Sequence, residues 1–120
     1  MARMVIYFDG GCLGGNRFGK AYGSASFNGK IETYDFGVGS NNEAEYKTFH
    51  KVLDYLIENK IKDALVYGDS ALVINQVLGI NKVNAPHLKP LKISACKKMK
   101  ELSIDLVWVP RETILEKLGH

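Results

Sequence analysis

The 120-residue sequence has no long apolar run and very little cysteine, and both absences limit what the protein can be. No stretch approaches the roughly 20 apolar residues that a membrane-spanning helix needs. Cys12 and Cys96 are the only cysteines, and they show neither metal-ligand nor redox spacing. Residues 1–3 lead directly into an apolar segment, which leaves no room for a signal peptide. We therefore expect a cytoplasmic protein with reduced cysteines.

A strong excess of either charge is also missing. The formal net charge is +3, and 24% charged and 46% apolar residues are ordinary for a globular protein. This weakly basic balance permits a polyanionic partner but does not require one. Because the chain has no internal repeat, linker or low-complexity segment, we expect residues 1–120 to form a single domain, and we expect that domain to be monomeric.

The first 40 residues predict three antiparallel strands. The apolar run 4–8 is typical of a strand buried on both faces, and it stops at Asp9. The Gly-rich segment 10–16 predicts a loop in which the backbone turns sharply and can approach a ligand closely. Segments 21–27 and 31–38 predict a hairpin. On this evidence alone, Asp9 could equally be the start of a turn.

A helix is predicted from about residue 41 to 59, with Ser40 and Glu43 as its capping box. Its buried stripe holds apolar residues at positions 49, 52 and 56, and Glu45 extends that stripe toward the N-terminus. A carboxylate facing the sheet is costly unless a cation or a hydrogen-bond donor meets it. The alternative is that Glu45 is a first-turn residue, favoured by the helix dipole, that reaches solvent.

Residues 64–69 repeat the opening design, because an apolar strand again ends in a carboxylate, Asp69. A short helix follows Ser70. This strand–helix–strand crossing predicts parallel pairing with the first strand, which would place Asp9 beside Asp69. Their ionised carboxylates would repel each other, and a divalent cation would remove that penalty.

The rest of the chain predicts a second amphipathic helix over 88–102, a strand over 104–109 and a helical tail over 111–120. The lysines around the second helix are expected on a solvated face, with phosphate contacts open for one or two of them. At the sheet edge, Asp9, Glu45 and Asp69 converge. Hard oxygen ligands of this kind favour Mg²⁺ or Mn²⁺ over zinc. Two such ions about 4 Å apart are a clamp for phosphodiester cleavage, in which one activates a water and the other stabilises the leaving oxygen.

These motifs, in this order and spacing, resemble the type 1 ribonuclease H family in its compact bacterial and archaeal form. The matching stretches are Asp9-Gly10-Gly11-Cys12-Leu13-Gly14, Asn41-Asn42-Glu43-Ala44-Glu45-Tyr46, Asp69-Ser70 with Leu72-Val73-Ile74-Asn75-Gln76, Lys82-Val83, and Trp108-Val109-Pro110-Arg111-Glu112. The resemblance implies an α/β, ribonuclease H-like fold. Its five-stranded mixed sheet would combine an antiparallel meander with two parallel strands and carry helices on both faces.

The resemblance also implies an activity and a set of site residues. The enzyme would be an endoribonuclease that cleaves the RNA strand of an RNA/DNA hybrid with two Mg²⁺ or Mn²⁺ ions, leaving 5′-phosphate and 3′-hydroxyl ends. The residues that it assigns to catalysis and metal binding are Asp9, Glu45 and Asp69, and those that it assigns to the substrate are Asn16, Asn41, Asn42 and Ser70. Asparagines in the minor groove suit recognition by shape and 2′-hydroxyls. Helix capping is the alternative role for Asn41 and Asn42.

The chain departs from the family at its end, where a fourth carboxylate is expected as part of an Ala-Asp pair. Ungapped alignment puts Leu118 at that position. Removing two residues from the preceding loop aligns Leu115-Glu116-Lys117-Leu118 with the usual Ala-Asp-x-Leu, so we predict that Glu116 is the fourth ligand and a catalytic residue. Glu112 and His120 are the alternatives, and the catalytic histidine of the longer forms has no counterpart in the expected loop.

Two other functions compete with this prediction. The altered tail would fit a hybrid-binding module that has lost activity. The fold would also suit a different nuclease, such as a junction resolvase or an exonuclease. The Asn41-Asn42 pair argues against this third function, because such a pair serves 2′-hydroxyl recognition.

Overall fold

The computed structural model describes residues 3–13 and 19–119. Its five strands form one sheet in the order β3-β2-β1-β4-β5. The strands are β1 (Met4–Cys12), β2 (Gly19–Phe27), β3 (Lys30–Gly39), β4 (Asp63–Gly68) and β5 (Ser103–Trp108). Strand β2 pairs antiparallel with both β1 and β3, whereas β4 pairs parallel with β1 and β5. The predicted mixed sheet is therefore confirmed.

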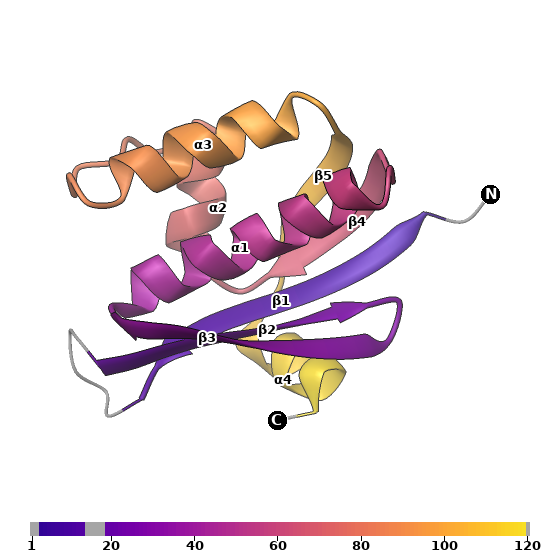
Figure 1. Ribbon diagram of the computed structural model, residues 1–120, viewed down its shortest axis with the longest axis horizontal. Coiled ribbons are helices and arrows are strands. Elements are labelled where there is room, and N and C mark those ends of the chain that lie inside the picture. The colour runs from indigo at the N-terminus through magenta and orange to yellow at the C-terminus, as the bar shows by residue number, and fades with distance from the viewer. Residues whose placement is uncertain (1–2, 14–18, 120) are drawn as a thin grey trace.

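Helices cover both faces of this sheet, as predicted (Figure 1). They are α1 (Asn41–Glu58), α2 (Ala71–Val77), α3 (Lys89–Met99) and α4 (Arg111–Leu118). Helices α1 and α3 lie on one face and α4 lies against the other, where it contacts β1 and β2. None of the helices in the described part of the chain is long and apolar enough to cross a membrane.

Strand β1 continues beyond Asp9 to Cys12, so the predicted loop from Gly10 onward was wrong at its start. Gly10 pairs with Gly23 in the antiparallel ladder with β2. A Cβ atom on Gly10 would lie only 2.6 Å from the backbone of Ala44 and Glu45 in α1. The glycine is thus needed for the close approach of a helix to a strand, and not for a turn.

Helix α1 begins as the sequence predicts. The hydroxyl of Ser40 accepts a hydrogen bond from the Glu43 amide at 3.2 Å, and the Glu43 carboxylate accepts one from the Ser40 amide at 3.3 Å. Phe49 and Val52 are fully buried along the stripe that faces the sheet. Glu45 lies on the same stripe and is only 7% exposed, so it does not reach solvent as a snorkelling residue would.

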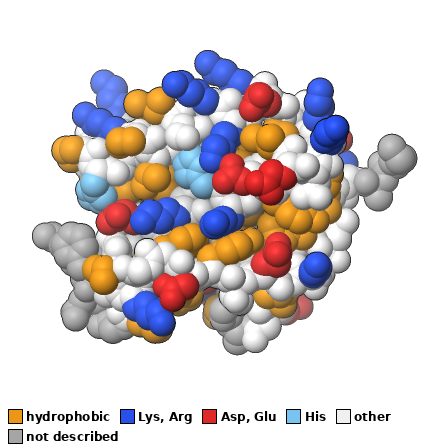
Figure 2. Space-filling model, viewed as in Figure 1, with side chains coloured by type: hydrophobic (Ala, Val, Ile, Leu, Met, Phe, Trp, Pro, Cys, Tyr) orange, Lys and Arg blue, Asp and Glu red, His pale blue; other side chains and the backbone are white. Residues whose placement is uncertain are grey.

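Helices α1 and α3 are joined by a polar contact. The His50 Nε2 atom donates to the Leu91 carbonyl at 2.8 Å, so Nδ1 is free to accept from the Lys98 ammonium at 2.9 Å. Lys98 also forms an ion pair with Asp54 at 2.7 Å. It is therefore not one of the solvated lysines that were predicted around α3. On the face that α1 and α3 form, Lys and Arg side chains are dispersed, with acidic side chains between them (Figure 2). This face therefore does not present a continuous basic surface.

Candidate metal centre

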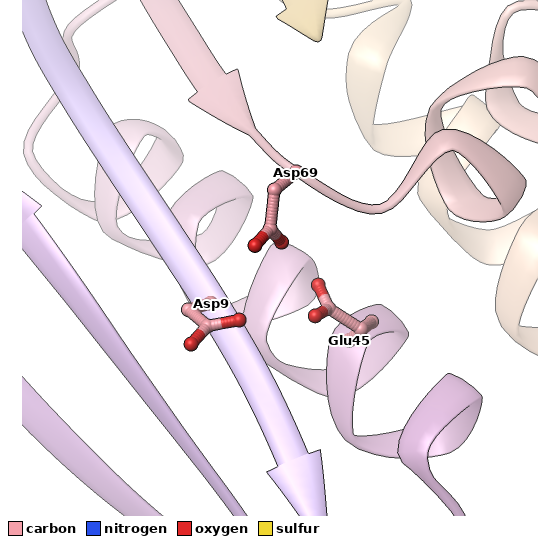
Figure 3. Close-up of side chains that lie close together, drawn as sticks. All are labelled: Asp9, Glu45 and Asp69. Atoms are coloured by element: carbon pink, nitrogen blue, oxygen red, sulfur yellow. The ribbon is translucent and has the colours of Figure 1, made fainter. Parts of the chain in front are cut away.

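The parallel pairing of β1 and β4 places two carboxylates together. Phe8 is opposite Gly68 in the ladder, so Asp9 and Asp69 follow at the same edge of the sheet. Glu45 reaches this edge from the second turn of α1. One carboxylate oxygen of each residue lies within 4.8 Å of the other two, and the three side chains converge on one point (Figure 3). The convergence predicted for these residues is therefore present.

The surroundings of these carboxylates fit a divalent cation. Asp9 is 3% exposed and Glu45 is 7% exposed. The Glu45 Oε1 atom accepts a hydrogen bond from the Gly10 amide at 3.2 Å. Within the part of the chain that the structure describes, the buried Asp9 Oδ1 and Glu45 Oε2 atoms have no hydrogen-bond partner. Buried carboxylate oxygens that lack a donor and share one focus form a donor set suited to Mg²⁺ or Mn²⁺.

The electrostatics of the cluster also favour a bound cation. Burial, followed by the charges of Asp9 and Asp69, raises the pKa of Glu45 well above its ordinary value. Burial, followed by the Asp9 charge, also raises the pKa of Asp69, although the Arg111 guanidinium opposes this effect. Three like charges in a buried site are costly, and a bound cation would remove most of that cost.

Arg111 is a site residue to which the sequence analysis assigned no role. Its Nη1 atom lies 3.1 Å from Asp69 Oδ2 and 3.7 Å from Asp9 Oδ1. Arg111 is the first residue of α4 and follows the end of β5, a parallel strand whose carboxyl end meets the same edge. The sequence could have indicated this role through that position, because a residue just past the carboxyl end of a parallel strand lies at the same sheet edge as the carboxylates.

A cavity of about 520 Å³ lies over the carboxylates. The predicted substrate residues Asn41, Asn42 and Ser70 line it, as do Glu45, Asp69, Gly10, Gly11, Cys12, Tyr22, Trp108 and Arg111. The N-cap of α1 is Ser40, so capping by an asparagine side chain does not account for Asn41 and Asn42. Ser70 is itself the N-cap of α2, where its hydroxyl accepts from the Val73 amide at 3.3 Å. The predicted substrate residue Asn16 lies outside the described residues.

The family model described as RNase H matches residues 1–110. The chain belongs to the RNase H family. Three solved RNase H structures are similar to it. RNase H1 from the archaeon Halobacterium salinarum is 27% identical, with a TM-score of 0.84 over 94% of this chain and 89% of that one. The N-terminal RNase H domain of Rv2228c from Mycobacterium tuberculosis is 29% identical, with a TM-score of 0.85 over 97% of this chain and 88% of that one.

The third structure is LC11-RNase H1 in complex with an RNA/DNA hybrid, which is 25% identical with a TM-score of 0.83 over 95% of this chain and 90% of that one. Among curated proteins, this RNase H chain is 32% identical to the bifunctional protein Rv2228c of Mycobacterium tuberculosis over 98% of its own length. It spans only 35% of that relative, so it corresponds to about a third of the longer protein.

The predicted fourth ligand lies apart from this RNase H site. Glu116 is exposed on α4, does not line the cavity and is not part of the carboxylate cluster. Glu112 is exposed as well, and His120 lies outside the described residues. The assignment of a fourth ligand to Glu116 therefore stays a prediction.

Proposed function

We propose that this RNase H family protein cleaves the RNA strand of RNA/DNA hybrids by metal-dependent hydrolysis, leaving 5′-phosphate and 3′-hydroxyl ends. The observation that carries the proposal is the buried carboxylate cluster under an open cavity, with two carboxylate oxygens that lack a hydrogen-bond donor. Family membership supports the reaction class, and the hybrid bound to the similar LC11-RNase H1 supports the substrate.

In this proposal Asp9, Glu45 and Asp69 hold two Mg²⁺ or Mn²⁺ ions, which when bound supply an activated water and charge neutralisation at the leaving oxygen. The polar side chains at the start of α1 and α2, which are Asn41, Asn42 and Ser70, bind the hybrid together with Asn16. Their amide and hydroxyl groups can donate to and accept from 2′-hydroxyl groups in the wide minor groove, so binding is independent of sequence.

We further propose that Glu116 provides a fourth carboxylate for the second ion. The position of α4 supports this, because its first residue, Arg111, already contacts Asp69. Glutamate is one methylene longer than the usual aspartate and gives a looser ligand geometry. Mn²⁺ should then support activity better than Mg²⁺, which demands near-ideal octahedral coordination.

The second candidate function is a hybrid-binding module with weakened catalysis. One observation favours it, which is that Glu116 is exposed and outside the carboxylate cluster. This candidate predicts binding of the hybrid without cleavage. A nuclease for other substrates is disfavoured, because both asparagines line the cavity where a 2′-hydroxyl would lie.

The deciding experiment incubates the protein with an end-labelled RNA/DNA hybrid in Mn²⁺, in Mg²⁺ and in EDTA. We expect cleavage of the RNA strand only with metal, and none in Asp9→Asn or Asp69→Asn. Asp35→Asn is the matched control, because Asp35 lies on β3 and its side chain is 65% exposed. Cleavage in EDTA or in either site variant would refute the proposal, and binding without cleavage would favour the second candidate.

A further inference from the structure

We infer that Trp108 is a substrate-contact residue whose indole packs against the sugar–phosphate backbone of the hybrid beside the scissile phosphate. The inference rests on the proposed function, and it adds an apolar contact to a site whose predicted substrate residues are all polar. The indole lines the same cavity as Glu45 and Asp69, and it remains 50% exposed. An aromatic ring of this size left half in water beside polar groups is a common feature of recognition surfaces.

The indole is held in place before any ligand arrives. Its Nε1 atom donates a hydrogen bond to the Asp69 carbonyl oxygen at 3.1 Å. The adjacent backbone is also fixed, because the Val109 amide donates to the Gly68 carbonyl at 2.9 Å and extends the ladder beyond β5. A ring fixed in this way loses little conformational entropy on binding, so the contact contributes more of its free energy to affinity.

Nothing on the neighbouring strand competes for the exposed ring. Trp108 is opposite Gly68 in the parallel ladder, and glycine has no side chain to cover it. Among the described residues, β5 is the edge strand of the sheet, and no further strand pairs with it. The exposed indole surface and the carboxylates of Glu45 and Asp69 therefore border one space, which is where a backbone presenting its phosphate to the metal site would lie.

The class of contact follows from the substrate. In a duplex hybrid the bases are paired and stacked, so their faces are not available to a side chain at the groove surface. The exposed apolar groups beside a scissile phosphate are the C–H groups of the ribose, which pack well on an aromatic face. This interaction does not depend on base identity and fits sequence-independent binding.

Steady-state kinetics on a labelled hybrid in Mn²⁺ test the inference. We expect Trp108→Ala to raise KM about tenfold, the usual scale for truncating a large aromatic contact residue, while kcat changes less, since the lost contact is made in the bound state. Trp108→Phe keeps an aromatic ring but loses the N–H donor, and it should recover most of the affinity. Val107→Ala is the control from the same strand, because Val107 is 38% exposed and does not line the cavity.

A second readout needs no turnover. Trp108 is the only tryptophan in the sequence, so its fluorescence reports on this position alone. In the Asp9→Asn variant, which should leave the hybrid intact, saturating hybrid should change the emission intensity or maximum. Unchanged emission together with a wild-type KM for Trp108→Ala would overturn the inference while the cleavage proposal stands.

Two further outcomes distinguish a failure of this inference alone from a failure of the proposed function. If Trp108→Phe and Trp108→Ala lose kcat equally and keep the wild-type KM, the indole acts through its hydrogen bond to Asp69, and the substrate contact is refuted. If the wild-type protein neither binds nor cuts the hybrid, the proposed function fails and this inference fails with it.

Discussion

Glu45 and Glu43 are two residues apart on α1 and have different surroundings. Glu45 is buried in the carboxylate cluster, whereas Glu43 completes the capping box with Ser40. We predict that Glu45→Gln lowers hybrid cleavage by about two orders of magnitude or more without loss of folding. Glu43→Ala should cost about 1 kcal/mol of unfolding free energy at most and leave cleavage largely intact. Cleavage rates and chemical denaturation of both variants check this, and the reverse assignment of effects would contradict it.

The raised pKa of Glu45 makes the stability of the metal-free protein depend on pH. The folded state keeps the proton at pH values where the unfolded chain, with a pKa near 4.5, has lost it. The free energy of unfolding in EDTA should therefore fall as pH rises from about 4.5 through the raised pKa. Glu45→Gln removes this contribution, so the variant should gain stability relative to the wild type as pH rises.

The difference in unfolding free energy between the wild type and Glu45→Gln reports the contribution of Glu45. Burial lowers the pKa of His50, so its contribution to stability rises with pH and opposes that of Glu45. Both proteins contain His50, and its effect cancels in their difference. Urea denaturation at several pH values in EDTA gives that difference, and two parallel pH profiles would contradict the prediction.

At the scale of elements, the packing of α1 on β1 sets the position of Glu45. Because a Cβ atom on Gly10 would lie 2.6 Å from the backbone of Ala44 and Glu45, Gly10→Ala must push the helix away from the strand. We predict a loss of about 1–3 kcal/mol in unfolding free energy and a clear loss of cleavage. Gly39→Ala is the matched control, since its nearest neighbour, the Cβ atom of Ala21, is 3.4 Å away. Equal behaviour of the two variants would refute the argument.

Helix α4 offers a separate test, because its Glu112 and Glu116 lie four residues apart on one helix. We predict that Glu116→Gln reduces hybrid cleavage in saturating Mn²⁺ and that Glu112→Gln does so much less. The reason is that Glu112 follows Pro110 at the very start of the helix, whereas the buried Ile114 and Leu118 anchor the turns around Glu116. Wild-type cleavage by Glu116→Gln would show that the gapped alignment of the tail is wrong.

Local patterns predicted the elements well, and contacts between elements explain the differences. The start of β1 at Met4, the capping box at Ser40 and the buried stripe with Glu45 depend on neighbours along the chain, and all three were predicted. Strand β2, in contrast, begins at Gly19, two residues before its predicted start. The extension of β1 through Gly10 was not, because a glycine needed for close packing against a helix looks in sequence like a glycine in a turn. The role of Arg111 was missed for a similar reason, since it depends on the pairing of β5 with β4.

At the scale of the whole molecule, the carboxylate cluster places concentrated negative charge in a chain whose net charge is +3. The topology produces this arrangement, because Asp9 on β1, Asp69 directly after β4 and Glu45 on α1 meet at the same edge of the sheet. Arg111 is the cation that contacts Asp9 and Asp69 in the described structure, and its side chain is 59% exposed. Solvent screening weakens an ion pair of that exposure, so Arg111 offsets the repulsion only in part.

Metal binding should therefore stabilise the entire fold. A ligand that binds only the folded state at a hundred times its dissociation constant adds about 2.7 kcal/mol to the free energy of unfolding. For a protein of this size, that corresponds to a rise in Tm of roughly 10 °C. We predict such a rise when Mn²⁺ replaces EDTA in thermal denaturation followed by circular dichroism. Glu45→Gln and Asp69→Asn should show a much smaller rise, because each removes a ligand together with part of the repulsion. In EDTA both variants should melt at or above the wild-type Tm, whereas Asp35→Asn should follow the wild type in both buffers. Equal Tm values for the wild type with and without Mn²⁺ would contradict a metal site at this edge, whatever the cleavage assay shows.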